Sequence, residues 1–452
     1  MLLNLGRGVL LKYEPKTEEF TDPTKVRIVF FNVARDLLNE LSQSKNISLN
    51  YRELMSLAKI LVRQTIGFGL VEILLMDKNL QDIFLNAPIP QNPIFVKHAK
   101  YEECATNILP SAEDADSWAA KLRLQSGRPL DEANPILDTE LLLGNLRARV
   151  AAIQRPLSPD GIAYALRRPR EEPWTLPLYI SNKMMNAFTA GLLSFLIDGA
   201  RTILIAGTRS SGKTSLLGAL MLELTPKVRA LIVEDTLELP VDYLRDAGYN
   251  IQRMKVRSAL LETTTEIQAA EGIRASLRLG DSALIVGEVR SDEAKALYEA
   301  MRVGALANVV AGTIHGASPY AVFDRVVNDL GVPITSFKAT DLILVANPIK
   351  TPDGLHSLKR VVQLAEVRKH WTKDPEEEKG FVDLLKYDVE KDELVPTDEL
   401  INGDSEIIKS IAANVKGWAG NWDAIYDNII LRGRVKQELV DAARKFKMPE
   451  LM

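Results

Sequence analysis

The stretch Gly207-Thr208-Arg209-Ser210-Ser211-Gly212-Lys213-Thr214 follows the pattern G-x-x-x-x-G-K-[ST]. A strand-like apolar run precedes it at residues 202–206, and a helix-like run follows it at residues 215–224. This order predicts a phosphate-binding loop, because glycines let backbone N–H groups curl around a phosphate and the helix N-terminus adds positive potential. Lys213 is expected to reach the β- and γ-phosphates of a nucleotide, and Thr214 to hold Mg²⁺. The alternative is a glycine turn that merely caps a helix, and the matching flanks argue against it.

The composition is that of an ordinary globular chain. Its 452 residues, 46% hydrophobic and 26% charged, predict two to four domains. The 56 Lys and Arg against 60 Asp and Glu give a net charge of −4, which argues against a surface wholly devoted to nucleic acid or to an anionic membrane. A local basic patch stays compatible with that balance. Cys104 is the single cysteine, so no internal disulfide can form and a reducing cytoplasm is the expected compartment.

Charged residues interrupt the longest apolar stretches. Arg7 and Lys12 flank only a short apolar run, so no signal peptide is expected. The two most apolar regions, residues 54–76 and 187–206, both contain charged side chains and are not expected to cross a bilayer. Any membrane contact is therefore expected to go through partners.

Patterns along the chain predict five segments. An N-terminal segment (1–50) precedes a smaller α+β domain (51–168), and residues 169–177 form a proline-punctuated linker. Residues 178–365 alternate strand-like and helical runs, which predicts an α/β domain with a largely parallel sheet. Residues 366–452 are expected to form a polar, partly helical C-terminal extension. The candidate strands of the α/β domain are 202–206, 229–233, 283–287, 308–313 and 342–346.

Acidic residues follow two of these strands. Glu234, Asp235 and Glu238 come after one, and Glu288 comes after another. Ligands bind beyond the carboxyl ends of parallel strands, where such acids can reach Mg²⁺ or orient an attacking water. The alternative is that they cap the helices that follow. The predicted Mg²⁺ ligands are Thr214, Asp235 and Glu288.

A third strand leads into Thr313 and His315. A polar pair at such a strand tip is placed to sense a γ-phosphate, and neutral histidine can donate one hydrogen bond there. A lone histidine is more often structural, which is the competing interpretation. The sequence shows no paired His or Cys spacing that indicates zinc and no convincing Ser/His/Asp arrangement.

Arginines crowd the stretch before the linker. A solvated basic face is the simpler interpretation. The sharper hypothesis is that some of them reach the nucleotide of a neighbouring subunit, where a planar, always charged guanidinium neutralises charge on the transferring phosphoryl group. The six are Arg147, Arg149, Arg155, Arg167, Arg168 and Arg170.

These elements, in this order, resemble the secretion-superfamily ATPases, the hexameric motors of type II secretion, type IV pili, Tad pili, archaella and type IV secretion. Residues 232–239 (IVEDTLEL) are similar to the family's Asp box, residues 286–290 (VGEVR) to its Walker B motif, and residues 312–316 (GTIHG) to the distal half of its His box. The resemblance spans roughly residues 50–365 and is strongest to archaeal Tad and type IV pilus assembly ATPases. Further segments that carry it are 126–131, 134–138, 149–153, 160–168 and 301–331.

The resemblance implies a RecA-like P-loop domain, a ring of six subunits and a Mg²⁺-dependent ATPase that converts ATP to ADP and phosphate. Glu288 is then expected to act with Mg²⁺ and water, and Glu238 to orient the attacking water. Arg149 and Arg167 correspond to arginines that approach the nucleotide from the N-terminal domain. The implied catalytic residues are Glu238, Glu288, Lys213, Arg149, Arg167 and His315. The implied ATP-binding residues are Gly207, Thr208, Arg209, Ser210, Ser211, Gly212, Lys213, Thr214 and Ser215.

The resemblance also implies a setting: a cytoplasmic motor at the inner face of the cell membrane that powers assembly of an archaeal type IV pilus-like filament or a related secretion system. The implied partners are other copies in a homohexamer, a polytopic membrane platform protein and, indirectly, pilin-like subunits, with no direct nucleic acid. One departure from the pattern is that Gly304 is followed by Ala305, where the His box usually begins with Gly-His.

Two other functions compete with this one. A DNA-translocating RecA-like motor would need a basic, aromatic-bearing loop facing the pore, and no convincing one is present. A non-hydrolysing, ATP-gated scaffold is disfavoured because Lys213, Thr214, Glu238 and Glu288 are all intact.

Overall fold

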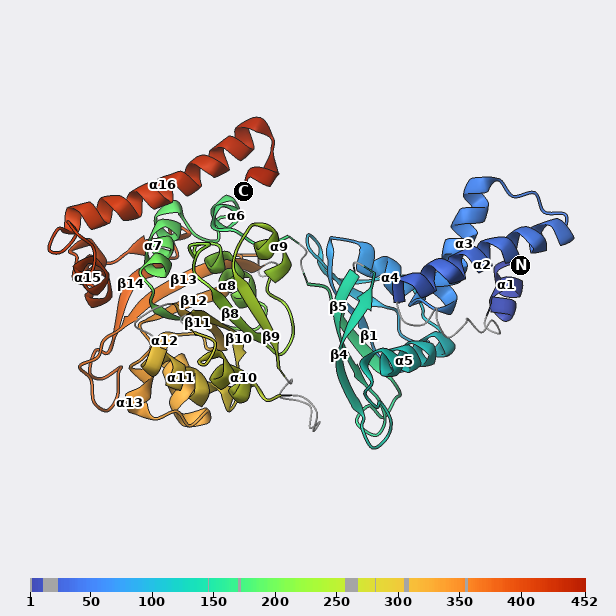
Figure 1. Ribbon diagram of the computed structural model, residues 1–452, viewed down its shortest axis with the longest axis horizontal. Helices are drawn as coiled ribbons and strands as arrows, with labels where there is room; N and C mark the ends of the chain where they lie inside the picture. Colours follow the sequence, from blue (N-terminus) through green and yellow to red (C-terminus); the bar gives the residue numbers. More distant parts are fainter. Residues whose placement is uncertain are drawn as a thin grey trace. The chain divides into compact units, whose positions relative to one another are not determined.

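The computed structural model describes residues 2–10, 23–144, 146–169, 172–256, 267–280, 282–304, 309–353 and 357–452. Its contacts divide the chain into two compact units, residues 1–170 and residues 171–452 (Figure 1). The division falls inside the stretch expected to be a linker, whose residues 170 and 171 lie outside the described part. The chain is a mixed α/β protein, as expected.

The first unit is built on a six-stranded antiparallel sheet in the order β3-β2-β1-β6-β5-β4. Helices α4 (Gly69–Met76) and α5 (Ala112–Ser126) bury Val71 and Trp118 in one core with the strands. The strands are β1 (Leu80–Leu85), β2 (Phe95–His98), β3 (Glu102–Ala105), β4 (Ile136–Leu143), β5 (Leu146–Ile153) and β6 (Ala163–Arg167).

Three further helices lie before α4 in the described part of the chain: α1 (Leu2–Leu10), α2 (Pro23–Ser44) and α3 (Tyr51–Thr65). Apolar residues at helical spacing give them a shared core that includes Leu38 and Leu61. The expected boundary at residue 50 therefore separates two helices that pack together. Among the described residues no single helix is long and apolar enough to span a membrane, and α3 with α4 would be so only as a pair bent by 110°.

The second unit contains a nine-stranded sheet in the order β15-β14-β13-β12-β7-β11-β10-β8-β9. Strands β12, β7, β11, β10, β8 and β9 are parallel, and β13, β14 and β15 continue antiparallel from β12. The strands are β7 (Thr202–Gly207), β8 (Ala230–Glu234), β9 (Ile251–Lys255), β10 (Ala283–Val289), β11 (Val310–His315), β12 (Leu342–Lys350), β13 (Ser357–Val367), β14 (Phe381–Asp388) and β15 (Glu393–Pro396).

Helices cover both faces of this sheet (Figure 1). Ile203 and Ile205 of β7 face one core, and Leu204 and Ala206 face the other, because successive strand residues point to opposite sides. The first core contains α7 (Ala187–Asp198) and α8 (Lys213–Met221). The second contains α10 (Ala269–Ser276), α11 (Glu293–Gly304), α12 (Pro319–Asp324) and α13 (Ile334–Phe337). The shorter elements are α6 (Leu176–Ser181), α9 (Val241–Asp246), a π-helix (Arg325–Asp329), α14 (Asp398–Ile401) and a 3-10 turn (Pro449–Leu451).

The C-terminal residues belong to this second unit. The expected boundary at residue 365 falls inside β13, and β14 and β15 extend the same sheet. Helix α15 (Glu406–Ala413) is tied to β13 because buried Glu366 accepts hydrogen bonds from Ser405 Oγ (2.5 Å) and Glu406 N (3.0 Å). The tail therefore packs as part of the sheet rather than as an appendage.

Helix α16 (Trp422–Phe446) crosses α7 at close range. A Cβ on Gly191 would lie 2.3 Å from the carbonyl oxygen of Ile429, so glycine is required for the two backbones to approach this closely. Arg432 of α16 donates to Asp198 (2.5 Å), and Lys436 pairs with Glu223, just beyond α8, at 2.9 Å. The last long helix thus holds both α7 and the end of α8.

Candidate functional site

The loop between β7 and α8 has the backbone that the sequence pattern predicts. A Cβ on Gly207 would lie 2.1 Å from the carbonyl oxygen of Ala346 in β12, so a larger residue cannot fit there. Gly212 has φ +92°, a left-handed conformation, and stands directly before the first turn of α8. All nine residues expected to bind ATP lie in this loop and the first turn of α8. Their roles stay predictions.

Lys213 is 8% exposed and turns back over its own loop. Its Nζ donates to the carbonyl oxygens of Gly207 (3.1 Å) and Thr208 (2.9 Å), and lies 3.4 Å from His315 Nδ1. Burial lowers the pKa of Lys213, as does the positive charge of Arg290, whereas Glu288 opposes them. The charged ammonium group is therefore destabilised in this site, and a negatively charged ligand would stabilise it.

His315, at the end of β11, stands between Lys213 and Glu288. Because an ammonium group can only donate, Nδ1 must accept from Lys213, and the ring proton then sits on Nε2. Nε2 lies 3.1 Å from Glu288 Oε1 but is not aligned for a hydrogen bond. Burial and the charge of Lys213 lower the pKa of His315, so the ring is neutral at pH 7. Thr313, by contrast, is buried and donates to the carbonyl oxygen of Gly287 (2.6 Å), away from this cluster.

Glu288 lies within an irregularity in the pairing of β10 with β11, between Val286 and Val289. Such bulges re-aim side chains at functional sites. Arg290 Nη2 donates to Glu288 Oε2. Burial opposes ionisation of Glu288, but the hydrogen bond from Arg290 and the nearby positive charges outweigh it and lower the pKa of this carboxyl. Glu288 is therefore a carboxylate at neutral pH.

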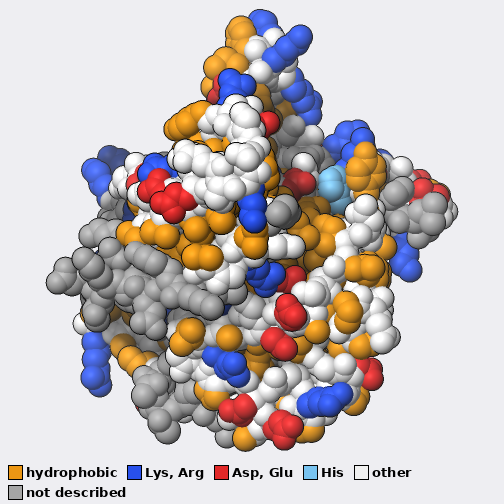
Figure 2. All heavy atoms as spheres, turned by 90° about the vertical axis from the view of Figure 1, so that its right-hand side faces the viewer, with side chains coloured by type: hydrophobic (Ala, Val, Ile, Leu, Met, Phe, Trp, Pro, Cys, Tyr) orange, Lys and Arg blue, Asp and Glu red, His pale blue; other side chains and the backbone are white. Residues whose placement is uncertain are grey.

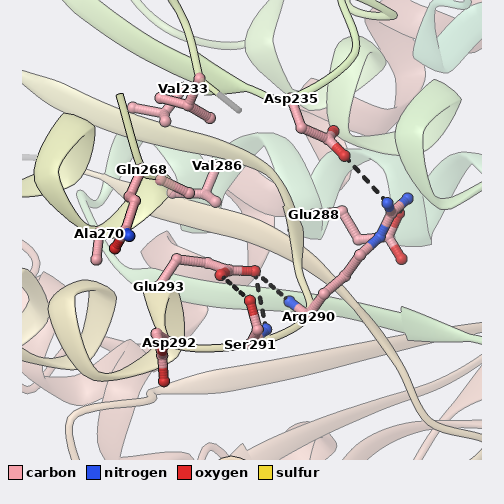
Figure 3. A pocket seen from close by; sticks show the side chains of 12 residues that line it. Val233, Asp235, Gln268, Ala270, Val286, Glu288, Arg290, Ser291, Asp292 and Glu293 are labelled. Atoms are coloured by element: carbon pink, nitrogen blue, oxygen red, sulfur yellow. Dashed lines mark hydrogen bonds and ion pairs between the residues drawn. The ribbon is translucent and has the colours of Figure 1, made fainter. Parts of the chain in front are cut away.

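Arg290 also joins two neighbouring strands. Its Nη1 donates to Asp235 Oδ2 (3.0 Å), just beyond β8, as Figure 3 shows. Its Nη2 donates to Glu288 of β10. The bond to Glu288 raises the pKa of Arg290. Asp235 and Glu288 are thus placed around one positive charge, and Glu288 Oε1 is a buried oxygen without a hydrogen bond. This unpartnered carboxylate oxygen is the kind of hard donor that Mg²⁺ prefers. Both oxygens of Asp235, by contrast, accept hydrogen bonds, one from Arg290 and one from the N–H of Thr236. Among the described residues no group of three or more His, Cys, Asp or Glu could by itself hold a metal.

Glu238 lies in the turn after β8, which Glu234 holds in place. Oε1 of Glu234 accepts the backbone N–H groups of Glu238 (2.9 Å) and Leu239 (2.8 Å). Oε2 is buried and has no hydrogen-bond partner. Burial raises the pKa of Glu234 to about 7, against the effect of these two N–H groups. Glu234 therefore positions Glu238 from a buried site in which its own carboxyl ionises less readily.

Replacing Glu234 with glutamine should remove a pH-dependent loss of stability. The pKa is about 7 in the folded chain against 4.5 for an exposed carboxyl. The folded state holds the proton more tightly, so stability is highest below pH about 4.5 and falls until about pH 7. Each pH unit in this range changes the free energy of unfolding by about 1.4 kcal/mol. Measured by urea unfolding, the stability of Glu234→Gln relative to the wild type should therefore rise by about 2.5 kcal/mol between pH 5 and pH 8. If the stability of the wild type and of Glu234→Gln changed with pH in the same way, Glu234 would not be the source of the pH dependence. The matched control is Glu399→Gln, at an exposed position.

A pocket of about 270 Å³ adjoins the carboxylates (Figure 3). Its lining contains no residue of the 207–215 loop. Glu293, at the start of α11, accepts the backbone N–H groups of Arg290 (2.5 Å) and Ser291 (3.0 Å), which fixes the chain after β10. Because no residue of the phosphate loop lines it, this pocket is not the expected nucleotide site. Its lining is Val233, Asp235, Val256, Gln268, Ala269, Ala270, Val286, Glu288, Arg290, Ser291, Asp292 and Glu293.

The expected arginines lie in the first unit and are bound to carboxylates there. Arg149 of β5 and Arg167 of β6 are directly opposite each other, which puts them on one face of the sheet. Arg149 makes two hydrogen bonds to Asp138 (3.2 and 2.8 Å), and Arg167 makes one to Asp82 (2.7 Å). Both aspartates are buried residues, so they orient the guanidinium groups firmly.

The other arginines do not form a bare basic face. Arg147 lies 3.9 Å from Glu140, Arg155 donates to the carbonyl oxygen of Pro159 (3.0 Å), and Arg168 donates to that of Asp77 (3.3 Å). Arg170, and Ala305 of the atypical His box, lie outside the described residues. Among the described side chains on the face drawn in Figure 2, basic, acidic and apolar groups are interspersed.

Two residues of the cluster were missed as site residues. Arg290 is part of the quoted 286–290 motif, but nothing in its spacing predicts a bond to Asp235. Asn347 of β12 accepts the backbone N–H of Thr208 (3.1 Å) and donates to the carbonyl oxygen of Ala317 (3.2 Å). No motif marks it, because its partners lie 139 and 30 positions away.

Residues 105–358 match the protein family described as "Type II/IV secretion system protein". The uncharacterized protein MJ0781 of Methanocaldococcus jannaschii is 29% identical over 283 residues, 61% of this chain and 38% of that protein. A second uncharacterized protein of the same organism, MJ0900, is 26% identical over 386 residues, 84% of this chain and 66% of that protein. The chain thus spans less than two thirds of the length of either relative.

Among solved structures, the Legionella pneumophila ATPase DotB is similar at 17% sequence identity, with a TM-score of 0.46, over 84% of this chain and 91% of that chain. The family match covers more than half of the 452 residues. It includes the phosphate loop, both acidic strand ends and His315. The chain belongs to the type II/IV secretion system protein family.

Proposed function

We propose that this protein is a Mg²⁺-dependent ATPase with a RecA-like motor domain. The observation that carries the proposal is a continuous series of contacts from Lys213 through His315 and Glu288 to Arg290 and Asp235. It links the phosphate loop to the carboxylates across the ends of β7, β11, β10 and β8, which are consecutive in the sheet. Ligands of such sheets bind beyond the carboxyl ends of the strands.

Each residue then has a defined task. Lys213 exchanges the carbonyl oxygens of Gly207 and Thr208 for the β- and γ-phosphate oxygens, which satisfy a buried ammonium group better. Glu288 remains ionised, and His315 lies between it and Lys213. Glu238, fixed by Glu234, orients the attacking water. Thr214, Asp235 and Glu288 are the residues that would hold Mg²⁺, which would supply positive charge to the phosphates.

We further propose a homohexamer that works at the cytoplasmic face of the cell membrane, where it powers assembly of a type IV pilus-like filament or a related secretion system. Its partners would be a polytopic platform protein and, through it, pilin-like subunits. Membership of the secretion family and the similarity to archaeal proteins support this setting. The mixed charge on the described face in Figure 2 is compatible with a partner other than nucleic acid.

The test is steady-state ATP hydrolysis with Mg²⁺ on size-separated protein, with and without single-stranded and duplex DNA. Activity confined to a hexamer and indifferent to DNA is the expected result. Strong stimulation by DNA would replace the filament motor with a nucleic-acid motor. Failure of every fraction to bind or hydrolyse ATP would overturn the ATPase itself.

Replacing Arg149 with alanine should slow hydrolysis by the assembled ring by about a hundredfold or more, because a guanidinium supplied to a transferring phosphoryl group is worth at least that much. ATP binding by isolated monomers should be unchanged, since the proposed contact is to a neighbouring subunit. The measurement is kcat of the ring beside the Kd of the monomer. Monomers that hydrolyse ATP at the rate of the ring would contradict the idea.

The control separates catalysis from folding. Truncating Arg149 leaves the carboxylate of Asp138 buried without its partner, which by itself destabilises a fold. Asp138→Asn removes the same ion pair but keeps the guanidinium. If both variants lose activity equally and unfold at the same lowered temperature, Arg149 stabilises the sheet and has no role in hydrolysis.

A further inference from the structure

Asn347 stands where three neighbouring strands meet the phosphate loop. The register pairs Ala206 of β7 with Val345 of β12, and Gly207 with His315 of β11. The phosphate loop therefore leaves the sheet between β12 and β11, with Asn347 beside its first residue. The carbonyl oxygen of Ala346 allows no side chain at Gly207, so the end of β12 is a firm support for the loop.

The side chain of Asn347 spans the gap between β12 and the segment after β11. Oδ1 accepts the N–H of Thr208 (3.1 Å), and Nδ2 donates to the carbonyl oxygen of Ala317 (3.2 Å). The two partners fix the orientation of the amide, since an N–H requires the oxygen and a carbonyl requires the NH₂. Aspartate, which only accepts, and leucine, which has no polar group, could not make both bonds.

These bonds connect the same two segments that Lys213 and His315 connect. Thr208 begins the phosphate loop and Lys213 ends it, while Ala317 lies two residues after His315. The Lys213 Nζ to His315 Nδ1 distance is 3.4 Å. The loop and the His315 segment are thus joined twice, once through Asn347 and once through the proposed catalytic groups.

We infer that Asn347 is a positioning residue that couples the phosphate loop to His315, so that ATP bound by the loop fixes His315 against Glu288. The inference rests on the proposed ATPase function and adds to it a residue outside every recognised motif. Asn347 touches neither Glu288 nor the carboxylate of Asp235 in any described contact, so its effect on the reaction passes through the two segments it holds.

The experiment is a double-mutant cycle on the full chain, with ATP affinity measured by calorimetry in Mg²⁺. Asn347→Ala should weaken ATP binding by about tenfold, the effect of one or two neutral hydrogen bonds. His315→Ala should weaken it severalfold in the wild-type background but by less than twofold in the Asn347→Ala background. The inference would be overturned if the affinity loss of the double variant equalled the product of the two single losses. Wild-type ATP affinity in Asn347→Ala would overturn it as well.

Asn186→Ala is the matched control. This asparagine also accepts one backbone N–H, from Thr189 (2.8 Å), and donates to a carbonyl oxygen, that of Leu394 (2.9 Å), but it lies at the start of α7. It should leave ATP affinity unchanged. If Asn347→Ala fails to fold, the isosteric Asn347→Asp, which keeps only the acceptor for Thr208, takes its place in the same cycle. A wild type that binds no ATP would overturn the proposed function itself, whereas multiplicative losses overturn only the coupling.

Discussion

Replacing Lys213 with alanine is expected to weaken ATP binding by about a hundredfold or more. Lys213 is 8% exposed, and among the described residues its ammonium group contacts two carbonyl oxygens and a histidine nitrogen. Two charge-assisted hydrogen bonds to phosphate oxygens are worth about 1.5–3 kcal/mol each, and about 1.4 kcal/mol corresponds to a tenfold change. Calorimetric titration with ATP and Mg²⁺ measures the loss directly.

The matched control is Lys227→Ala, which removes an exposed lysine in the turn after α8. It should bind ATP like the wild type. Removing Lys213 also deletes two bonds within the loop, so thermal unfolding of both variants must accompany the titration. A folded Lys213→Ala protein with undiminished affinity would show that nucleotide binds elsewhere, and the pocket beside Arg290 would become the next candidate.

Replacing Glu288 with glutamine should leave ATP binding within a fewfold of the wild type while lowering kcat on the order of a hundred- to a thousandfold. Glutamine keeps an oxygen for Arg290 but carries no charge, so it cannot help to hold Mg²⁺ or to polarise the attacking water. The split between an unchanged Kd and a lost kcat distinguishes this role from a structural one.

Glu299→Gln, on the exposed side of α11, is the control for the loss of one negative charge near this sheet edge. Its kcat should equal that of the wild type. Undiminished turnover in Glu288→Gln would remove Glu288 from the mechanism and leave Glu238 as the remaining acidic candidate.

The sequence predicted the centre of the nine-stranded sheet because that region obeys local rules. Residues 203–206 of β7 are all apolar because the strand is buried on both faces. The loop needs glycine at positions 207 and 212 because of the backbone conformation there. The edge strands escaped prediction for the opposite reason. Strand β9 (IQRMK) is half exposed, and β13 to β15 alternate polar and apolar residues after the last recognised motif, so the expected boundary at residue 365 cut through β13.

The site divides in the same way. Lys213, Asp235, Glu288 and His315 follow strands whose order along the chain is regular, so their meeting at one sheet edge could be predicted. The partners that hold them could not. Arg290 reaches a residue 55 positions away, and Asn347 one 139 positions away. Such contacts depend on strand order and register, which a single sequence does not encode in any short pattern.

The close crossing of α16 over α7 has a consequence for any attempt to isolate the nucleotide module. A fragment ending at residue 365 would stop within β13, strip away β14 and β15, and bare the backbone of α7 at Gly191. Strand β12 would keep a truncated neighbour beside a newly exposed apolar surface, the usual route to aggregation. We therefore expect the module and its tail to unfold together, and a folded fragment that carries Lys213 to need the chain through α16.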